Sequence, residues 1–153
     1  MDTVERLEAI EDITQLKARY FRCLDTKDWD GFAEVFTPDA RMDMSGELRG
    51  RSRPGEGITT GNQEIAAFVR RMVGDVTTVH HGHTPEIDVT SPTTATGIWA
   101  MEDRLGWPDG GPLRAMHGYG HYHDAYEKVQ GQWRIRSTTL TRLRVDVDTA
   151  TDS

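Results

Sequence analysis

The chain has 153 residues, of which 36% are hydrophobic, and its formal net charge is −7. This length suits one domain with a modest core, and the acidic excess argues against a nucleic-acid-binding surface. The single cysteine excludes an internal disulfide and fits a reducing, cytoplasmic compartment, and without a long apolar run we expect no membrane-spanning helix.

Hydrophobic spacing predicts helices in the first half of the chain. Apolar residues recur every three or four positions from about Val4 to Thr26, which indicates one long amphipathic helix. Asp28 is expected to cap a second, short helix that ends at Pro38, and Asn62 a third. The remaining expected elements are a strand at 39–45, a glycine-rich loop at 46–61 and the third helix at 62–72.

The second half of the chain changes to a strand period. Turn residues separate the runs, with tight hairpins expected at Ser91-Pro92 and Gln130-Gly131. Helices followed by a meander of long strands predict an α+β fold, with the concave face of a curled sheet packed on the helices around a pocket. We expect residues 1–153 to form one domain with a flexible tail at 146–153. The expected strands are 77–90, 93–107, 113–129 and 132–147.

Three of the six histidines, His80, His81 and His83, fall within four residues of one expected strand. Histidine is the side chain that exchanges a proton near neutral pH without help from its surroundings. Strict alternation places His81 and His83 on the face of Ile87, whereas a bulge at Pro85 would reverse the parity and turn His80 inward. A metal site would need further converging ligands, and no second His/Cys cluster occurs, so we expect no metal.

Other polar residues could face the same pocket. Asp25 ends the first helix, where it either caps the helix or lies buried and orients a histidine. Tyr20 lies in the apolar stripe of that helix and is either a core aromatic or a pocket hydroxyl. Asp103 is in phase with apolar strand neighbours, Tyr119 lies on a strand with polar and aromatic residues on both faces, and Arg142 is either ion-paired or solvated. No phosphate loop, dinucleotide fingerprint or nucleophile elbow occurs, which favours acid–base chemistry without a cofactor.

Several segments resemble the bile acid 7α-dehydratases, and the similarity covers roughly residues 5–145. More distantly, the chain is similar to scytalone dehydratase, hexachlorocyclohexane dehydrochlorinase and other SnoaL-like proteins. The resemblance implies a cone-shaped α+β barrel, with N-terminal helices packed on the concave face of a curved mixed β-sheet, an enclosed apolar pocket, a homotrimer and no cofactor. The matching segments are QLKARYFRCLD (15–25), HTPEI (83–87), TATG (94–97), EDRL (102–105), YEK (126–128) and GQW (131–133).

The resemblance also implies roles for individual residues. Tyr20, Asp25 and His80 fall on the catalytic tyrosine, aspartate and histidine of the dehydratases. Asp103 and Arg142 fall on polar residues that shape the substrate pocket. The resemblance therefore favours His80, rather than His81 or His83, as the inward histidine.

Three further residues are candidates for substrate binding. His83 matches a family histidine without a clear role, and Tyr119 is the second candidate. Met44 stands where the dehydratases have a pocket tyrosine, and a second family tyrosine has no counterpart near Pro112. Two polar contacts are thus lost, which indicates conserved chemistry on a different substrate.

We therefore expect a cofactor-independent dehydratase, a lyase that eliminates water from a steroid-like or other fused-ring hydroxy-ketone by His–Asp acid–base catalysis. An isomerase or cyclase on a similar ligand is the first alternative, because it needs the same base but no leaving hydroxyl. A non-enzymatic small-molecule binding module is the second, since a fold alone does not fix function. The expected partners are a small hydrophobic substrate, free or as a coenzyme A thioester, and further copies of the chain, without nucleic acid or membrane.

Overall fold

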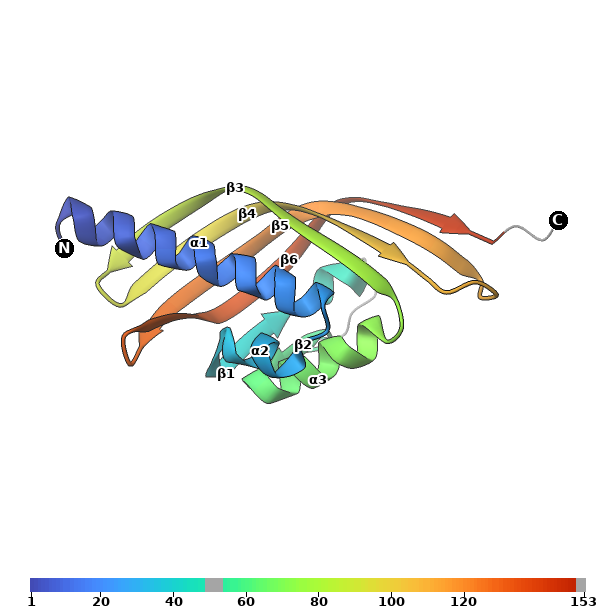
Figure 1. The fold of residues 1–153 in the computed structure, drawn as a ribbon, viewed down its shortest axis with the longest axis horizontal. Helices are drawn as coiled ribbons and strands as arrows, with labels where there is room; N and C mark the ends of the chain where they lie inside the picture. The colour runs from blue at the N-terminus through green and yellow to red at the C-terminus, as the bar shows by residue number, and fades with distance from the viewer. Residues whose placement is uncertain (49–53, 151–153) are drawn as a thin grey trace.

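A computed structural model describes residues 1–48 and 54–150 of the chain. Helices pack on one face of a six-stranded sheet with the order β2-β1-β6-β5-β4-β3 (Figure 1). Only β1 and β6 run parallel; the other neighbouring strands are antiparallel. In chain order the elements are α1 (Thr3–Asp25), α2 (Trp29–Glu34), β1 (Phe36–Asp43), the 3₁₀ helix η1 (Ser45–Leu48), β2 (Ile58–Thr60), α3 (Asn62–Val73), β3 (Thr77–Ser91), β4 (Thr94–Gly106), β5 (Leu113–Val129) and β6 (Gln132–Thr149).

The long helix α1 begins at a capping box. The Asp2 carboxylate accepts the backbone N–H of Glu5 at 2.9 Å, and the Glu5 carboxylate accepts the backbone N–H of Asp2 at 2.7 Å. These two bonds satisfy N–H groups that have no partner inside the helix. One face of the helix is then buried against the sheet, and it carries Ala9, Ile13, Leu16, Lys17, Tyr20, Cys23 and Leu24.

The sheet is curved, and its long strands β3–β6 arch over the helices (Figure 1). The core lies between this concave face and the helices, with Ile13, Phe32, Phe36 and Ile135 fully buried. The predicted α+β fold, with N-terminal helices on the concave face of a curved mixed sheet, is confirmed. The arrangement leaves the convex face of the sheet without a covering element among the described residues.

Element boundaries differ from the expected ones mainly between the second and third helices. Asp28 does cap α2, accepting the backbone N–H of Gly31 at 3.0 Å, but the helix ends at Glu34. Pro38 lies inside β1 and does not end the helix, because the chain has already turned into the strand at Phe36. The expected loop contains η1 and the short strand β2, while its residues 49–53 lie outside the described part of the chain.

Part of the segment expected as a flexible tail belongs to a strand. Strand β6 continues to Thr149, so residues 146–149 pair with β5, where His117 lies opposite Asp146. The pairing satisfies backbone groups that a mobile tail would leave to water. Residues 151–153 lie outside the described part of the chain.

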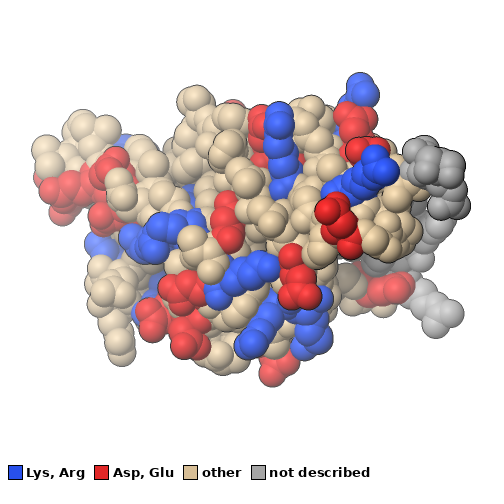
Figure 2. All heavy atoms as spheres, turned by 45° about the vertical axis from the view of Figure 1, so that its right-hand side comes forward, with Lys and Arg blue, Asp and Glu red and all other residues tan. Residues whose placement is uncertain are grey.

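Surface charges of both signs are interspersed on the face drawn in Figure 2, where the basic side chains form no continuous stripe. This distribution lacks the electrostatic footprint of a nucleic-acid-binding face on that side of the molecule. Within residues 1–48 and 54–150, no helix has the length and apolar character needed to cross a membrane.

Candidate active site

A row of residues across three strands forms the base of the site. His80 on β3 lies opposite Asp103 on β4, which in turn lies opposite Gly118 on β5. Because Gly118 has no side chain, Arg142 can reach from β6 across β5 to Asp103; a Cβ atom at position 118 would collide with both the arginine and the aspartate. The glycine at position 118 thus leaves the space in which His80, Asp103 and Arg142 come together.

Asp25 fixes the orientation of His80 from the last residue of α1. One carboxylate oxygen lies 2.7 Å from Nδ1 of His80 and accepts the Thr78 hydroxyl at 3.0 Å. The other oxygen accepts the backbone N–H of His80 at 2.9 Å. With Asp25 ionised, the short contact requires the proton on Nδ1, which leaves the lone pair of Nε2 free.

A β-bulge explains why His80 points inward. The register between β3 and β4 shifts between Gly82 and Pro85, so strict alternation does not hold across this segment. Before the shift the even-numbered residues face inward: Thr78 is buried and His80 is partly buried, whereas His81 is exposed. After the shift the odd-numbered residues are the more buried ones. The extra residue therefore reverses the parity, as the alternative reading of Pro85 required.

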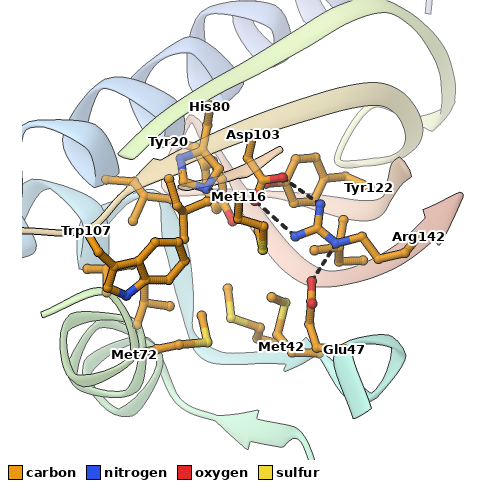
Figure 3. Close-up of a pocket in the computed structure, with 16 residues that line it drawn as sticks. Tyr20, Met42, Glu47, Met72, His80, Asp103, Trp107, Met116, Tyr122 and Arg142 are labelled. Carbon is orange, nitrogen blue, oxygen red and sulfur yellow. Dashed lines mark hydrogen bonds and ion pairs between the residues drawn. The ribbon is translucent and has the colours of Figure 1, made fainter. Parts of the chain in front are cut away.

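The site opens into a cavity of about 230 Å³ between the sheet and the helices. Apolar side chains form most of its wall, and the polar groups gather in one region, where Asp103, Arg142 and Glu47 border it (Figure 3). Such an apolar wall with a few convergent polar groups is typical of a small-molecule site. The lining residues are Tyr20, Leu24, Met42, Met44, Glu47, Val69, Met72, Val73, His80, Asp103, Leu105, Trp107, Met116, Tyr122, Leu140 and Arg142.

Arg142 is held between two carboxylates. Its Nη1 and Nη2 donate to the two oxygens of Asp103 at 2.6 and 3.0 Å, and its Nε donates to Glu47 at 2.7 Å. These hydrogen bonds and the nearby negative charges outweigh burial and raise the pKa of Arg142, so it stays cationic. Asp103 also lies 3.8 Å from Nε2 of His80, where it faces the free side of the imidazole.

Two tyrosines supply hydroxyl groups beside the histidine. Tyr20 and Tyr122 lie edge-to-face with ring centroids 5.7 Å apart, and both line the cavity. Burial raises the pKa of each phenol above its usual value of 10.0, with the charge of Asp124 as the next cause for Tyr20. Both hydroxyls therefore stay protonated at neutral pH. The Tyr122 hydroxyl is hydrogen-bonded to that of Tyr20, which leaves the Tyr20 hydroxyl to donate to a ligand.

A buried ion pair supports these tyrosines from behind. Nζ of Lys17 lies 2.7 Å from Asp124, and both side chains are fully buried. The same ammonium sits 4.3 Å from the centroid of the Tyr20 ring and 3.9 Å from that of Tyr122. Desolvation lowers the pKa of Lys17, while Asp124 opposes this shift. The pair holds the two rings at the back of the cavity.

Six of the eight predicted site residues lie together, and two do not. Asp25 contacts His80 behind the cavity, and Tyr20, His80, Met44, Asp103 and Arg142 line it. His83 and Tyr119 lie on the opposite face of the sheet, where His83 contacts Glu102 at 3.2 Å and Tyr119 contacts His117 at 3.1 Å. His83 faces outward because of the bulge in β3, and Tyr119 faces outward because it occupies an outward-facing position of β5. Neither residue is therefore part of the candidate site.

The sequence prediction missed Glu47, Tyr122 and Trp107, which also line the cavity. Tyr122 had a usable signal, because it is in phase with Gly118 and Gly120, and glycines on a strand mark a close approach of other groups. Glu47 and Trp107 follow strand ends and carried no periodic signal. Among the described residues, no group of three His, Cys, Asp or Glu side chains is arranged to hold a metal ion.

The arrangement can carry out acid–base chemistry. His80 has one nitrogen anchored on Asp25 and the other facing Asp103 across 3.8 Å of space beside the cavity. A proton taken up by Nε2 would create an imidazolium between two carboxylates, which stabilise its charge. The Tyr20 hydroxyl can donate to an oxygen on which negative charge develops.

Comparison with known proteins identifies related sequences and folds. The SnoaL-like domain model matches residues 5–139. A provisionally named cyclase of Gibberella zeae is 28% identical over 148 residues, which are 89% of this chain and 92% of that protein.

Two solved structures show the same fold. The structure of a provisionally assigned scytalone dehydratase from Novosphingobium aromaticivorans has a TM-score of 0.82 and 20% identity, covering 98% of this chain and 94% of that one. The hexachlorocyclohexane dehydrochlorinase LinA-type3 of Novosphingobium barchaimii has a TM-score of 0.78 and 17% identity, covering 95% and 94%. At these identities the likeness concerns the fold.

Proposed function

Because the chain belongs to the SnoaL-like domain family, we propose that it is a cofactor-independent dehydratase that removes water from a fused-ring hydroxy-ketone. The observation that carries the proposal is the anchored histidine: Nδ1 of His80 lies 2.7 Å from Asp25, while Nε2 is free beside an apolar cavity. A steroid-like ring system is the substrate suggested by the resemblance to bile acid 7α-dehydratases.

In the proposed reaction, His80 takes a proton from the carbon next to the substrate carbonyl. The C–H electrons form the new double bond, the C–O bond breaks, and the hydroxyl leaves as water with a proton returned from the imidazolium. Asp25 and Asp103 stabilise that imidazolium, and Arg142 fixes Asp103. A positioned base contributes about 10²–10⁴-fold to such a step. Tyr20 donates a hydrogen bond to the carbonyl oxygen as it gains charge.

The test is turnover by His80→Ala with hydroxylated fused-ring ketones, followed by mass spectrometry. We expect loss of one water with the wild type and a loss of rate of about 10²–10⁴-fold in the variant. His81→Ala is the matched control, because His81 is the exposed neighbour on the opposite face of β3. Full activity of His80→Ala would refute the assignment of the base.

A cyclase or isomerase is the second candidate, and the relative named a cyclase favours it. The same His80–Asp25 pair would then move a proton, and no hydroxyl would leave. Product mass separates the two reactions, since isomerisation leaves it unchanged and dehydration lowers it by one water. If the protein is instead a binding module, neither the wild type nor a variant with Tyr20, Asp25 and His80 all replaced should turn the ligand over. Both should bind it equally well.

We further propose that the protein assembles as a homo-oligomer, a trimer by the resemblance. The convex face of the sheet supports this proposal, since it carries the exposed apolar side chains Val79 and Ile98. Sedimentation velocity would test it, and a monomer at all concentrations would refute it.

A further inference from the structure

The strongest clue to the ligand is that Arg142, the one arginine among residues 1–48 and 54–150 that lines the cavity, already has its partners. A guanidinium carries five N–H donors. Arg142 directs three of them to the carboxylates of Asp103 and Glu47, and a fourth lies 3.7 Å from the sulfur of Met101. Recognition of a ligand carboxylate by arginine usually takes two parallel N–H groups, and Arg142 does not have two to offer.

The charges around the cavity point the same way. Glu47 and Asp103 line it together with Arg142, and Asp25 stands behind His80. In the described part of the chain, three carboxylates thus face one guanidinium and one imidazole. An incoming carboxylate or phosphate would meet a negative balance in a site with little water to screen it. The side chain of Asp103 is 5% exposed and that of Arg142 is 11% exposed, so the pair is shielded from solvent.

Cavity size limits the ligand further. An apolar cavity of about 150 Å³ holds one benzene molecule, whereas the cavity beside His80 measures about 230 Å³. By proportion it holds about nine non-hydrogen atoms, close to the ten carbons of two fused six-membered rings. The wall includes Met42, Met44, Met72 and Met116, whose flexible side chains adapt to the outline of a ring system without adding charge.

We propose that Glu47 is a specificity residue: with Asp103 it occupies Arg142, so that the cavity accepts an uncharged, two-ring oxygenated ligand and rejects carboxylates. This inference takes the ketone and hydroxyl groups of the ligand from the proposed function, whereas the limits on charge and size come from the cavity itself. It excludes a free acid at the reacting end and narrows the substrate from a four-ring steroid to a more compact ring system.

The test is isothermal titration calorimetry with a matched pair of probes, acetophenone and benzoate, which have the same number of non-hydrogen atoms. We expect the wild type to bind the ketone at least about tenfold more tightly than benzoate at pH 8. In Glu47→Gln, benzoate binding should tighten about tenfold, because one like charge beside the cavity is lost and a neutral amide holds Arg142 less strongly than a carboxylate does. Glu64→Gln is the control, since it removes the same charge from an exposed position on α3.

A size series uses cyclohexenone, 1-tetralone and androst-4-ene-3,17-dione, with tightest binding expected for the two-ring ketone. Benzoate binding equal to that of acetophenone, or no response to Glu47→Gln, would overturn the role of Glu47. Tighter binding of the steroid would overturn the size limit. Neither readout needs turnover, and none of these probes carries a hydroxyl that could leave. Failure of hydroxylated ketones to lose water would therefore refute the dehydratase and leave this inference standing.

Discussion

At the scale of single residues, a substitution of Tyr20 can distinguish the effect of its hydrogen bond from the effect of its packing. Its ring contacts Phe32 and Tyr122, with centroids 5.1 and 5.7 Å away, and these contacts survive in Tyr20→Phe. Loss of one donor to a developing oxyanion costs about 10²–10³-fold in kcat. We expect Tyr20→Phe to lower kcat by that amount with little change in KM, measured by steady-state kinetics. Tyr119→Phe, on the opposite face, is the control, and an unchanged kcat in Tyr20→Phe would contradict the donor role.

Loss of Lys17 should strongly destabilise the fold. It pairs with Asp124, which also accepts hydrogen bonds from Thr138 at 2.6 Å and Tyr126 at 2.9 Å. Lys17→Met leaves the aspartate charge buried without its cation, and removing one partner of such a pair costs about 3–5 kcal/mol. Urea denaturation measures this loss in the free energy of unfolding.

The double variant Lys17→Met/Asp124→Asn identifies the cause of that loss. If the uncompensated charge is responsible, the double variant should recover part of the stability, because asparagine keeps an acceptor for Thr138 without the charge. A double variant that is less stable than Lys17→Met would show instead that packing of the lysine stem dominates.

At the scale of elements, the site depends on how closely β4, β5 and β6 approach at one glycine. A Cβ atom at position 118 would collide with Asp103 and Arg142. We expect Gly118→Ala to displace the ion pair, to cost about 1–3 kcal/mol of stability and to lower kcat. Gly106→Ala is the matched control, because a Cβ there meets no atom within 4 Å. Equal stability and activity of the two variants would contradict the crowding at Gly118.

The same elements show how far the sequence alone could go. The long helix and the strands were predictable because their apolar periods extend over many residues, and α1 was placed within one residue at each end. Pro38 misled the prediction, since a proline marks a helix end in sequence but also fits a sheet position. The short strand β2 has three residues, too few for a period.

The site was only partly predictable for a different reason. Alternation alone placed the wrong histidines inward, because one extra residue at the bulge between Gly82 and Pro85 reverses every later side chain. Glu47 reaches Arg142 across 95 positions of sequence, and no local pattern encodes such a contact. His80 could be identified as the inward histidine by resemblance, whereas Glu47 could be identified as a cavity residue only from the three-dimensional structure.

At the scale of the whole molecule, the buried tyrosines predict how stability changes in alkali. Burial raises the pKa values of Tyr20, Tyr122 and Tyr126 above their usual value of 10.0. The folded protein therefore holds these protons more tightly than the unfolded chain. Their contribution to stability is fully present below pH 10 and is lost as pH rises from 10 towards the folded-state pKa values. Lys17, whose pKa burial lowers, offsets part of this loss.

We expect the free energy of unfolding in urea to fall between pH 9 and pH 11, by about 1 kcal/mol for each of the three tyrosines. Tyr126→Phe should reduce this pH-dependent loss even though it lowers stability at pH 9, because Tyr126 also bonds Asp124 and Trp99. A pH profile that is flat up to pH 11, or one that Tyr126→Phe does not change, would contradict the assignment, since a group whose pKa is higher in the folded than in the unfolded chain couples alkaline titration to unfolding.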